Sequence, residues 1–554
     1  MKRRHRALSA IAAALTGVAA LGGAPAQAAT PNNYPLSGFF IYSSKVNQTN
    51  IDKLEAIKAV GGDTVITFGS TLKPATLNAS NQVLKADGTV DPAYDNCQIS
   101  GAPCLTSITA GYTINRVFTF NNASHWGGGS IKCAKDKKVD FNGSTYTILL
   151  IPNLENGCYS SDNTYDVVAI DGGKTSDADP VVSVANAATS LGMKFYAGMP
   201  APIKRTDYAW LPDMSYSATL GKFTERFMMF QAANNNVAGL AGFYHTTEMP
   251  LVDSAAWTSV TDLYRIQNAA IEKYLPTREA VISPYLDARF SNTYTPASAT
   301  NAVKNIAATA SGTKLYIAPQ DGMGTGKGGA YMGNEATLNV DPFAASIVGA
   351  GTWGEKYQAP TSEYYKAAAA GITGTGATLW ANIEGMAPEV PTNICGSDSL
   401  RGQTTKARLD RQIQQTGLSV KKNITFMWDP YFTCKVNGTG PTLVENLVAN
   451  GGDPIINDSA ANPATGALTV YGYNLAGSSI KIKYTTPLGQ VQERTATVTS
   501  HNPNYGQTAA NGDFRLESAT VNFGAYSLGS GKYYMLYVTN GDGKTNKGFY
   551  SKLY

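Results

Sequence analysis

Two acidic side chains, far apart in the chain, stand at the ends of apolar segments. Glu248 ends the segment GLAGFYHTTE (239–248), and Glu384 lies near the end of ATLWANIEG (377–385). If both segments are parallel strands of one closed sheet, their carboxyl ends meet at the same rim, where barrel enzymes keep their active sites. Hydrolysis of a glycosidic bond needs such a pair. We therefore interpret Glu248 and Glu384 as candidate catalytic residues, with solvated loop carboxylates as the alternative.

The two carboxyl groups would divide the chemistry between them. One protonates the leaving oxygen, and the other attacks the anomeric carbon or activates water. A separation of about 5–5.5 Å implies retention of configuration, and about 6.5–9.5 Å implies inversion. The acid is expected in the more apolar surroundings, because desolvation raises its pKa toward about 6.

Other polar and aromatic residues lie in these two segments or near the ends of further apolar runs, and they are expected to contact the substrate. Side chains alternate along a strand, so Trp380 and Asn382 share a face with Glu384, and Tyr244 shares one with Glu248. The predicted substrate-binding residues are Tyr244, His245, Tyr285, Asp287, Gln320, Asp321, Trp380, Asn382 and Trp428.

Each of these residues has a structural alternative. His245 could equally be a hydrogen-bonded core histidine, and Trp380 and Trp428 could be packing residues. Asp287 is expected to pair with Arg289 rather than to act directly. The stretch QDGMGTGKGG (320–329) superficially resembles a phosphate-binding loop, but it lacks the Walker spacing and its Ser or Thr. We interpret it as an active-site loop.

Eight apolar runs alternate with amphipathic segments between residues 36 and 430. Their near-continuous apolarity is typical of parallel strands buried on both faces. Eight strand–helix units predict an α/β fold, a (β/α)8 TIM barrel over residues 30–450, with a doubly wound open sheet as the alternative. The predicted strands are 37–44, 63–70, 194–202, 239–248, 280–289, 314–322, 377–385 and 423–430.

The pattern departs from this alternation in two places. An insertion at about 85–180 carries four of the six cysteines and its own strand-like runs, although YTILLIPNL (146–154) could instead be a barrel strand. After residue 450 the helical segments end, and short alternating runs between turn residues predict an all-β sandwich over 451–554.

The six cysteines are even in number, and together with an export signal they predict disulfides. Fifteen pairings are possible, and sequence proximity suggests Cys97–Cys104, Cys133–Cys158 and Cys395–Cys434. None belongs to a CxxC motif, and only three histidines remain after residue 29. We therefore predict no zinc site, no other metal and no cofactor.

The N-terminus indicates export. MKRRHR is followed by an Ala- and Gly-rich apolar stretch and the sequence APAQAA, which together predict a signal peptide over residues 1–29 and a secreted protein. The formal net charge of +4 includes four cations of that peptide, so the mature chain is near neutral. We expect a monomer whose partner is a carbohydrate, with no nucleic acid and no membrane after cleavage.

Several motifs occur together in an order that resembles a known family. LSGFFIY, GFYHTTEMP, ISPYLDAR, YIAPQDGMG and LWANIEG resemble a bacterial family of TIM-barrel glycosyl hydrolases catalogued as a domain of unknown function. The resemblance covers roughly residues 35–435 without the insertion. It implies the barrel and a glycosidase-like site, but no substrate.

The arrangement is also similar to that of the large clan of retaining glycosidases. That similarity implies that Glu248 is the acid/base and Glu384 the nucleophile. The clan usually has asparagine directly before the acid/base, whereas Thr247 stands there in this chain. A non-catalytic glycan-binding or cell-surface protein on a degenerate barrel is the alternative function.

Overall fold

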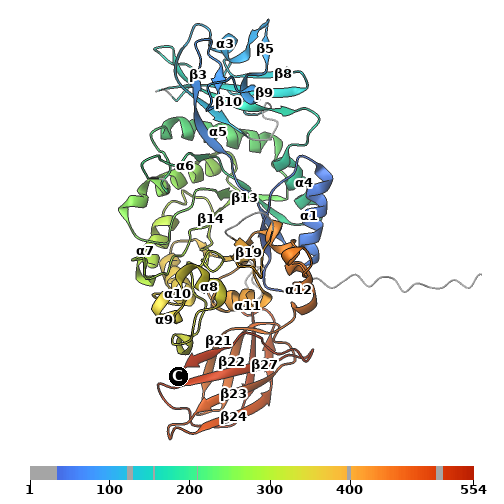
Figure 1. The fold of residues 1–554 in the computed structure, drawn as a ribbon, viewed down its shortest axis with the longest axis vertical. Helices are drawn as coiled ribbons and strands as arrows, with labels where there is room; N and C mark the ends of the chain where they lie inside the picture. Colours follow the sequence, from blue (N-terminus) through green and yellow to red (C-terminus); the bar gives the residue numbers. More distant parts are fainter. Residues whose placement is uncertain (1–33, 122–128, 154–155, 209, 396–400, 507–515) are drawn as a thin grey trace, which may run out of the picture.

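The computed structural model describes residues 34–121, 129–153, 156–208, 210–395, 401–506 and 516–554. The predicted signal peptide, 1–29, lies outside these residues. The molecule is elongated, with an inserted sheet at one end, a barrel in the middle and a β-sandwich at the other end (Figure 1).

A parallel sheet forms the central part, and its strands coincide with the eight predicted runs. Its order is β16-β15-β14-β13-β11-β2-β1-β20-β17. The strands are β1 (Gly38–Phe40), β2 (Thr64–Ile66), β11 (Lys194–Gly198), β13 (Leu240–His245), β14 (Glu279–Ile282), β15 (Leu315–Ile317), β16 (Thr378–Leu379), β17 (Ala381–Glu384) and β20 (Asn423–Phe426).

The sheet closes on itself because its two end strands are consecutive in the chain. Only Trp380 separates β16 from β17. The Trp380 N–H donates to Ile317 O of β15 at 2.8 Å, and the Ala381 N–H donates to Lys422 O at 2.9 Å, next to β20. One interrupted segment thus pairs with both neighbours, so eight segments form a barrel of the predicted TIM type.

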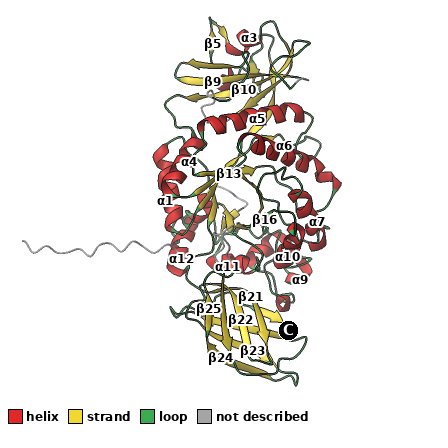
Figure 2. Ribbon diagram, turned by 180° about the vertical axis from the view of Figure 1, so that it is seen from behind, coloured by secondary structure: helices red, strands yellow, loops and turns green. Residues whose placement is uncertain are grey.

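Helices follow the strands and cover the barrel (Figure 2). Their starts obey ordinary capping rules: Asp179 caps α4 with a proline at its first position, and Thr405 caps α11. The helices are α1 (Asn47–Ala59), α4 (Pro180–Leu191), α5 (Ser217–Asn234), α6 (Thr258–Tyr274), α7 (Pro296–Ala307), α8 (Pro342–Val348), α9 (Trp353–Lys356), α10 (Thr361–Ile372), α11 (Lys406–Gln414) and α12 (Leu443–Asn450).

A second sheet forms the insertion between β2 and α4, and β12, which follows β11 in the chain, adds one edge strand to it. It begins at Thr71, upstream of the boundary near residue 85 that the sequence suggested. Residues 146–152 of the run YTILLIPNL lie in its strand β9, so they do not form a barrel strand. The sheet order is β12-β3-β7-β10-β9-β8. Its strands are β3 (Thr71–Leu77), β7 (Thr113–Phe120), β8 (Lys137–Phe141), β9 (Ser144–Pro152), β10 (Thr164–Lys174) and β12 (Ala201–Pro202).

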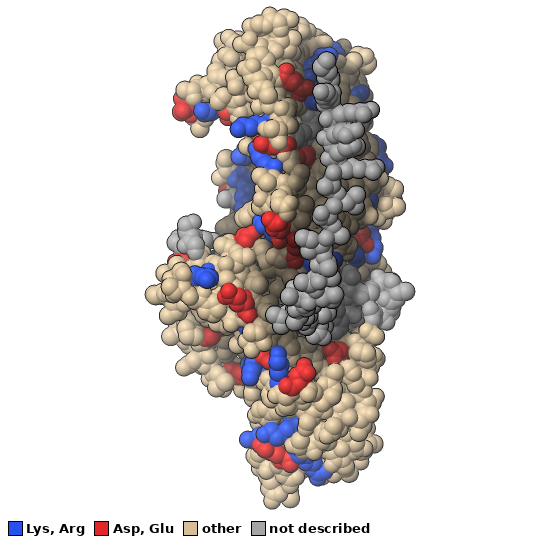
Figure 3. All heavy atoms as spheres, turned by 90° about the vertical axis from the view of Figure 1, so that its right-hand side faces the viewer, with Lys and Arg blue, Asp and Glu red and all other residues tan. Residues whose placement is uncertain are grey.

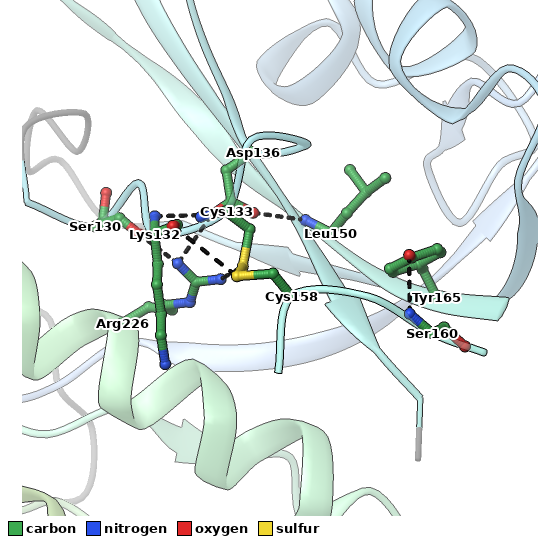
Figure 4. The surroundings of a disulfide bond; sticks show 9 residues. All are labelled: Ser130, Lys132, Cys133, Asp136, Leu150, Cys158, Ser160, Tyr165 and Arg226. Carbon is green, nitrogen blue, oxygen red and sulfur yellow. Dashed lines mark hydrogen bonds and ion pairs between the residues drawn. A yellow bond between two sulfur atoms is a disulfide. The ribbon is translucent and has the colours of Figure 1, made fainter. Parts of the chain in front are cut away.

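A buried ion pair attaches the insertion to the barrel beside one disulfide (Figure 4). Arg226 of α5 approaches Asp136 Oδ2 at 2.8 Å, and their side chains are 6% and 0% exposed. Asp136 also accepts hydrogen bonds from the backbone N–H groups of Cys133 and Leu150. The disulfides join Cys97 to Cys104, Cys133 to Cys158 and Cys395 to Cys434, the pairings that sequence proximity suggested.

Two four-stranded antiparallel sheets form the C-terminal sandwich. Their orders are β21-β22-β26-β25 and β24-β23-β27-β28. Alternate residues of β23 are buried, as expected for a strand with one face on a core. The strands are β21 (Ile455–Asn462), β22 (Ala467–Tyr473), β23 (Ser479–Thr485), β24 (Val491–Thr497), β25 (Ser500–Asn502), β26 (Glu517–Asn522), β27 (Tyr533–Thr539) and β28 (Ser551–Leu553).

The sandwich packs firmly on the barrel. Ile455 and Tyr473 belong to the apolar core of the barrel rather than to that of the sandwich. Arg411 of α11 donates to Phe549 O at 2.5 Å, and Asn457 donates to Ile413 O at 2.8 Å. These contacts bury the junction between the two parts.

The surface is sparsely charged, in keeping with 15% charged residues. On the face in Figure 3, positive and negative side chains are interspersed among uncharged ones. Over the described ranges, no helix combines the length and the apolarity that crossing a bilayer requires.

Candidate active site

A pocket of about 680 Å³ lies where several barrel strands end. Both Glu248, which follows β13, and Glu384, which ends β17, line it. Parallel strands present their carboxyl ends at one rim, which explains how two residues so distant in the chain meet. The full lining is Thr71, Ala201, Pro202, Ile203, Lys204, Trp210, Pro212, Thr246, Thr247, Glu248, Tyr285, Gln320, Thr325, Lys327, Glu384, Met386, Arg401 and Phe426.

Glu248 has the properties of a proton donor. Its carboxyl group is exposed to the pocket but surrounded by protein, and this desolvation raises its pKa to about 7. The negative charge of Glu384 adds to the shift, while Gln320 and Tyr244 oppose it by hydrogen bonding. The Tyr244 hydroxyl lies 3.3 Å from Glu248 Oε1. A carboxyl group with such a pKa keeps its proton in a large share of molecules at neutral pH.

Glu384 is held in one orientation by a loop. The backbone N–H of Thr325 donates to Glu384 Oε2 at 2.8 Å, and the Thr325 hydroxyl lies 3.2 Å from the same oxygen. Burial raises the pKa of Glu384, whereas Lys327, Thr325 and Arg401 lower it. A Cβ at Gly324 would come within 3.0 Å of Glu384 Oε2, so a glycine is needed there for the close approach.

Asp321 supports Glu384 from beneath the pocket. It is fully buried, and its Oδ1 accepts from the backbone N–H of Glu384 at 3.3 Å. Gln412 donates to Asp321 Oδ2 at 2.8 Å and to Glu384 O at 3.0 Å. Burial, followed by the charge of Glu384, raises the pKa of Asp321 to about 7. The expected direct contact with substrate does not fit this buried position.

Tyr285 and Gln320 are the predicted substrate-binding residues that line the pocket along with the two glutamates. Lys327 Nζ lies 4.5 Å from the centre of the Tyr285 ring, a cation–π contact. Gln320 donates to Ser283 O at 3.0 Å, which fixes its side chain beside Glu248.

His245 does not face the pocket. It is fully buried, and its ring nitrogens contact Gln267 Oε1 and, at 2.8 Å, Asn268 Oδ1, both on α6. Burial lowers its pKa to about 4. His245 therefore does not line the pocket, because alternation along β13 directs it away from the face of Tyr244, whose hydroxyl contacts Glu248.

Five further predicted residues lie outside the pocket lining. Tyr244 is buried, and its hydroxyl contacts Glu248 from within the protein. Trp380 stacks on Tyr316 with ring centres 4.1 Å apart, and Asn382 donates to Ser283 Oγ at 2.9 Å, so both fill the barrel interior below Glu384. Trp428 packs edge-on against Phe39 at 5.2 Å. Asp287 forms an ion pair with Arg289 at 2.6 Å, the alternative that the sequence favoured.

Fourteen of the eighteen lining residues were not predicted as site residues, and five of these carry a charged, hydroxyl or large aromatic side chain that matters for the chemistry of the site. Thr325 and Lys327 belong to the loop interpreted as an active-site loop, but alternation cannot rank residues within a loop. Lys204 and Trp210 follow β12, and Arg401 begins β19 (Arg401–Gln403). In the sequence, a tryptophan six residues after a lysine was the pattern that could have indicated Lys204 and Trp210 as site residues. Within the described chain, no cluster of three or more His, Cys, Asp or Glu side chains is arranged to hold a metal ion.

Comparisons with known proteins give weak likenesses. No family model and no curated protein sequence matches the chain. A candidate α-L-fucosidase from Bacteroides thetaiotaomicron aligns at a TM-score of 0.39 and 13% identity, covering 76% of this chain and 94% of its own. An endo-β-1,4-mannanase from Thermotoga petrophila aligns at 0.37 and 10%, covering 94% and 98%.

A β-mannanase from the blue mussel Mytilus edulis aligns at a TM-score of 0.31 and 10% identity, covering 76% of this chain and 92% of its own. All three are thus described as glycoside-cleaving enzymes. Scores this low do not establish a common fold or activity, and the barrel assignment depends on the strand pairing alone.

Proposed function

We propose that this protein is a secreted glycoside hydrolase that cleaves a poly- or oligosaccharide with Glu248 as acid/base and Glu384 as nucleophile. The observation that carries the proposal is that both glutamates line one pocket at the strand ends of the barrel. Paired carboxyl groups in a pocket are what glycosidic hydrolysis requires.

The surroundings of the two residues support this division of roles. Glu248 has its pKa raised to about 7, so it can donate a proton to the leaving oxygen. Glu384 accepts two hydrogen bonds from Thr325, which aim its oxygens and favour its ionised form. In a retaining reaction, Glu384 attacks the anomeric carbon as the glycosidic bond breaks, and the leaving oxygen takes the proton of Glu248. Water then attacks the glycosyl-enzyme, giving its proton back to Glu248 and releasing Glu384.

The remaining parts of the proposal concern context. We propose that the chain acts as a monomer on carbohydrate outside the cell, with neither nucleic acid nor membrane as a partner. The C-terminal sandwich would act as a spacer packed on the barrel.

The test is hydrolysis of a glycan panel by the full mature chain and by Glu248→Gln and Glu384→Gln variants. Each substitution keeps the side-chain shape and is expected to lower the rate by at least about 10²-fold, since it removes the acid or the nucleophile. Glu493→Gln, at an exposed position in the sandwich, is the control and should keep full activity. Full activity in both site variants would refute the proposal, and so would glycan binding without turnover by the wild type.

A further inference from the structure

The described side chains that line the pocket include charged groups of both signs. The cationic ones are Lys204, Lys327 and Arg401, and the acidic ones are Glu248 and Glu384. Hydrolysis needs the two acids, and Lys327 and Arg401 lower the pKa of Glu384, but neither role accounts for Lys204 at the pocket wall. The position of Lys204 therefore points to a property of the ligand.

Lys204 has no acidic partner among the residues that the structure describes. No carboxylate oxygen of those residues lies within ion-pair distance of its Nζ, and the side chain is exposed. Two acids lie on the same loop: Asp207 pairs with Arg205 through two hydrogen bonds, and Asp213 accepts from the backbone N–H of Ser215. A lysine without such a partner at a pocket wall keeps its charge available for an incoming anion.

Trp210 stands next to this lysine. Its ring is 65% exposed while lining the pocket, and Lys204 Nζ lies 5.5 Å from its centre. The loop that carries both is fixed at its base, where Arg205 N–H donates to Leu211 O at 2.9 Å and Asp213 N–H donates to Ile203 O at 2.8 Å. The flat ring suits the apolar face of a sugar, and the ammonium group beside it suits a charged substituent on that sugar.

Lys327 supplies a second cation deeper in the pocket. Its Nζ packs on the ring of Tyr285 at 4.5 Å, and no carboxylate of the described chain forms an ion pair with it. It is close enough to both glutamates to lower their pKa values. Positive charge thus occurs both at the rim, with Lys204, and near the catalytic pair.

We propose that the pocket takes an anionic saccharide, one that carries carboxylate or sulfate groups, with Trp210 stacking on a sugar ring and Lys204 pairing with its anionic group. The inference rests on the proposed function only for the choice of a saccharide. Its electrostatic part stands on the arrangement of Lys204, Trp210 and Lys327.

The test uses the full chain with Glu384→Gln, so that binding is measured without turnover. The probes are oligosaccharides of polygalacturonate, alginate and a sulfated galactan, each beside a neutral counterpart with its carboxyl groups reduced or its sulfates removed. Calorimetry should give a Kd for at least one acidic probe that is about tenfold lower than for its neutral counterpart, the effect of one charged hydrogen bond. Carboxylated and sulfated probes separate the two sources of charge.

Variants added to that background identify the residues responsible. Lys204→Gln should remove most of the preference for the acidic probe, and Trp210→Ala should weaken both members of a pair. Lys532→Gln, exposed on the sandwich, should change neither. Raising the ionic strength from about 0.01 to 0.15 M should weaken only the acidic probe, because the Debye length falls from about 30 to 8 Å.

The outcomes separate the two proposals. Equal binding of acidic and neutral probes, an unchanged preference in Lys204→Gln, or no binding of any acidic probe would overturn the anionic ligand. If one of these results is found and the wild type still hydrolyses neutral glycans, the hydrolase proposal is supported and the anionic-ligand proposal is not. If acidic probes bind with the expected preference but the wild type cleaves none, the anionic ligand stands and the hydrolase proposal falls.

Discussion

Thr325 donates both its backbone N–H and its hydroxyl to the same oxygen of Glu384, at 2.8 and 3.2 Å. A loop residue thereby fixes the carboxyl group that we propose as nucleophile. The two donors favour the ionised form of Glu384 against the burial that disfavours it.

Replacing Thr325 with valine should lower kcat/KM about three- to tenfold at neutral pH, because one hydrogen bond to a charged group is lost. Since that bond lowers the pKa of Glu384, its loss raises this pKa, and the acidic limb of the pH–rate profile should move to higher pH. Thr325→Ser keeps the hydroxyl and is the matched control. A valine variant with the wild-type profile would contradict the role of Thr325.

Asp321→Asn should change how stability depends on pH. The folded pKa of Asp321 is about 7, above its ordinary 3.8, so the folded state binds the extra proton between these values and its stability falls as pH rises through them. The variant removes this contribution, so the decline should become shallower by up to about 1.4 kcal/mol per pH unit. Urea unfolding at several pH values checks it, with exposed Asp542→Asn as control. An unchanged slope would mean that Asp321 is ionised throughout.

His245 should affect stability rather than substrate binding. Its folded pKa of about 4 is below the ordinary 6.5, so its contribution to stability is lost as pH falls from 6.5 toward 4. A neutral imidazole has one N–H, so His245→Phe leaves one amide oxygen, that of Gln267 or of Asn268, without its donor, at a cost of about 1–3 kcal/mol. KM, measured where both proteins are folded, should stay unchanged. A raised KM with unaltered stability would restore a direct role in binding.

The ion pair between Arg226 and Asp136 should be needed for the insertion to stay docked. Removing one partner leaves the other buried and unpaired, so Arg226→Met or Asp136→Asn should each cost about 3–5 kcal/mol. The double variant should cost less than the two single costs together. Hydrogen exchange of β9 amides reports the local effect. Strictly additive costs would show that the two residues act independently.

The sequence predicted the barrel well because its strands are buried on both faces and its helices have strong spacing and capping signals. Each of the eight runs contains a barrel strand, although the strands are shorter than the runs and the end of 194–202 joins the second sheet as β12. The start of the insertion was missed because TLKPATL (71–77) mixes polar residues with a proline and lacks a strand pattern.

The site was predicted only in part, for a geometric reason. Alternation correctly places Trp380, Asn382 and Glu384 on one face, but it says nothing about depth along the barrel axis. Glu384 therefore lines the pocket while Trp380 packs on Tyr316 inside the barrel. Lys204 and Trp210 belong to a loop. A loop sequence has no regular side-chain alternation, so it does not predict which side chains face the pocket or how deep they lie in it.

The junction between barrel and sandwich restricts how this chain can be divided. Tyr473 and Ile455 complete the apolar interior of the barrel, and the Tyr473 hydroxyl accepts from Asn423 of β20 at 3.4 Å. A chain truncated after residue 450 would leave that interior open to water and prone to aggregate. The sandwich therefore cannot be replaced by another domain through recombination unless the barrel residues that pack against it change as well.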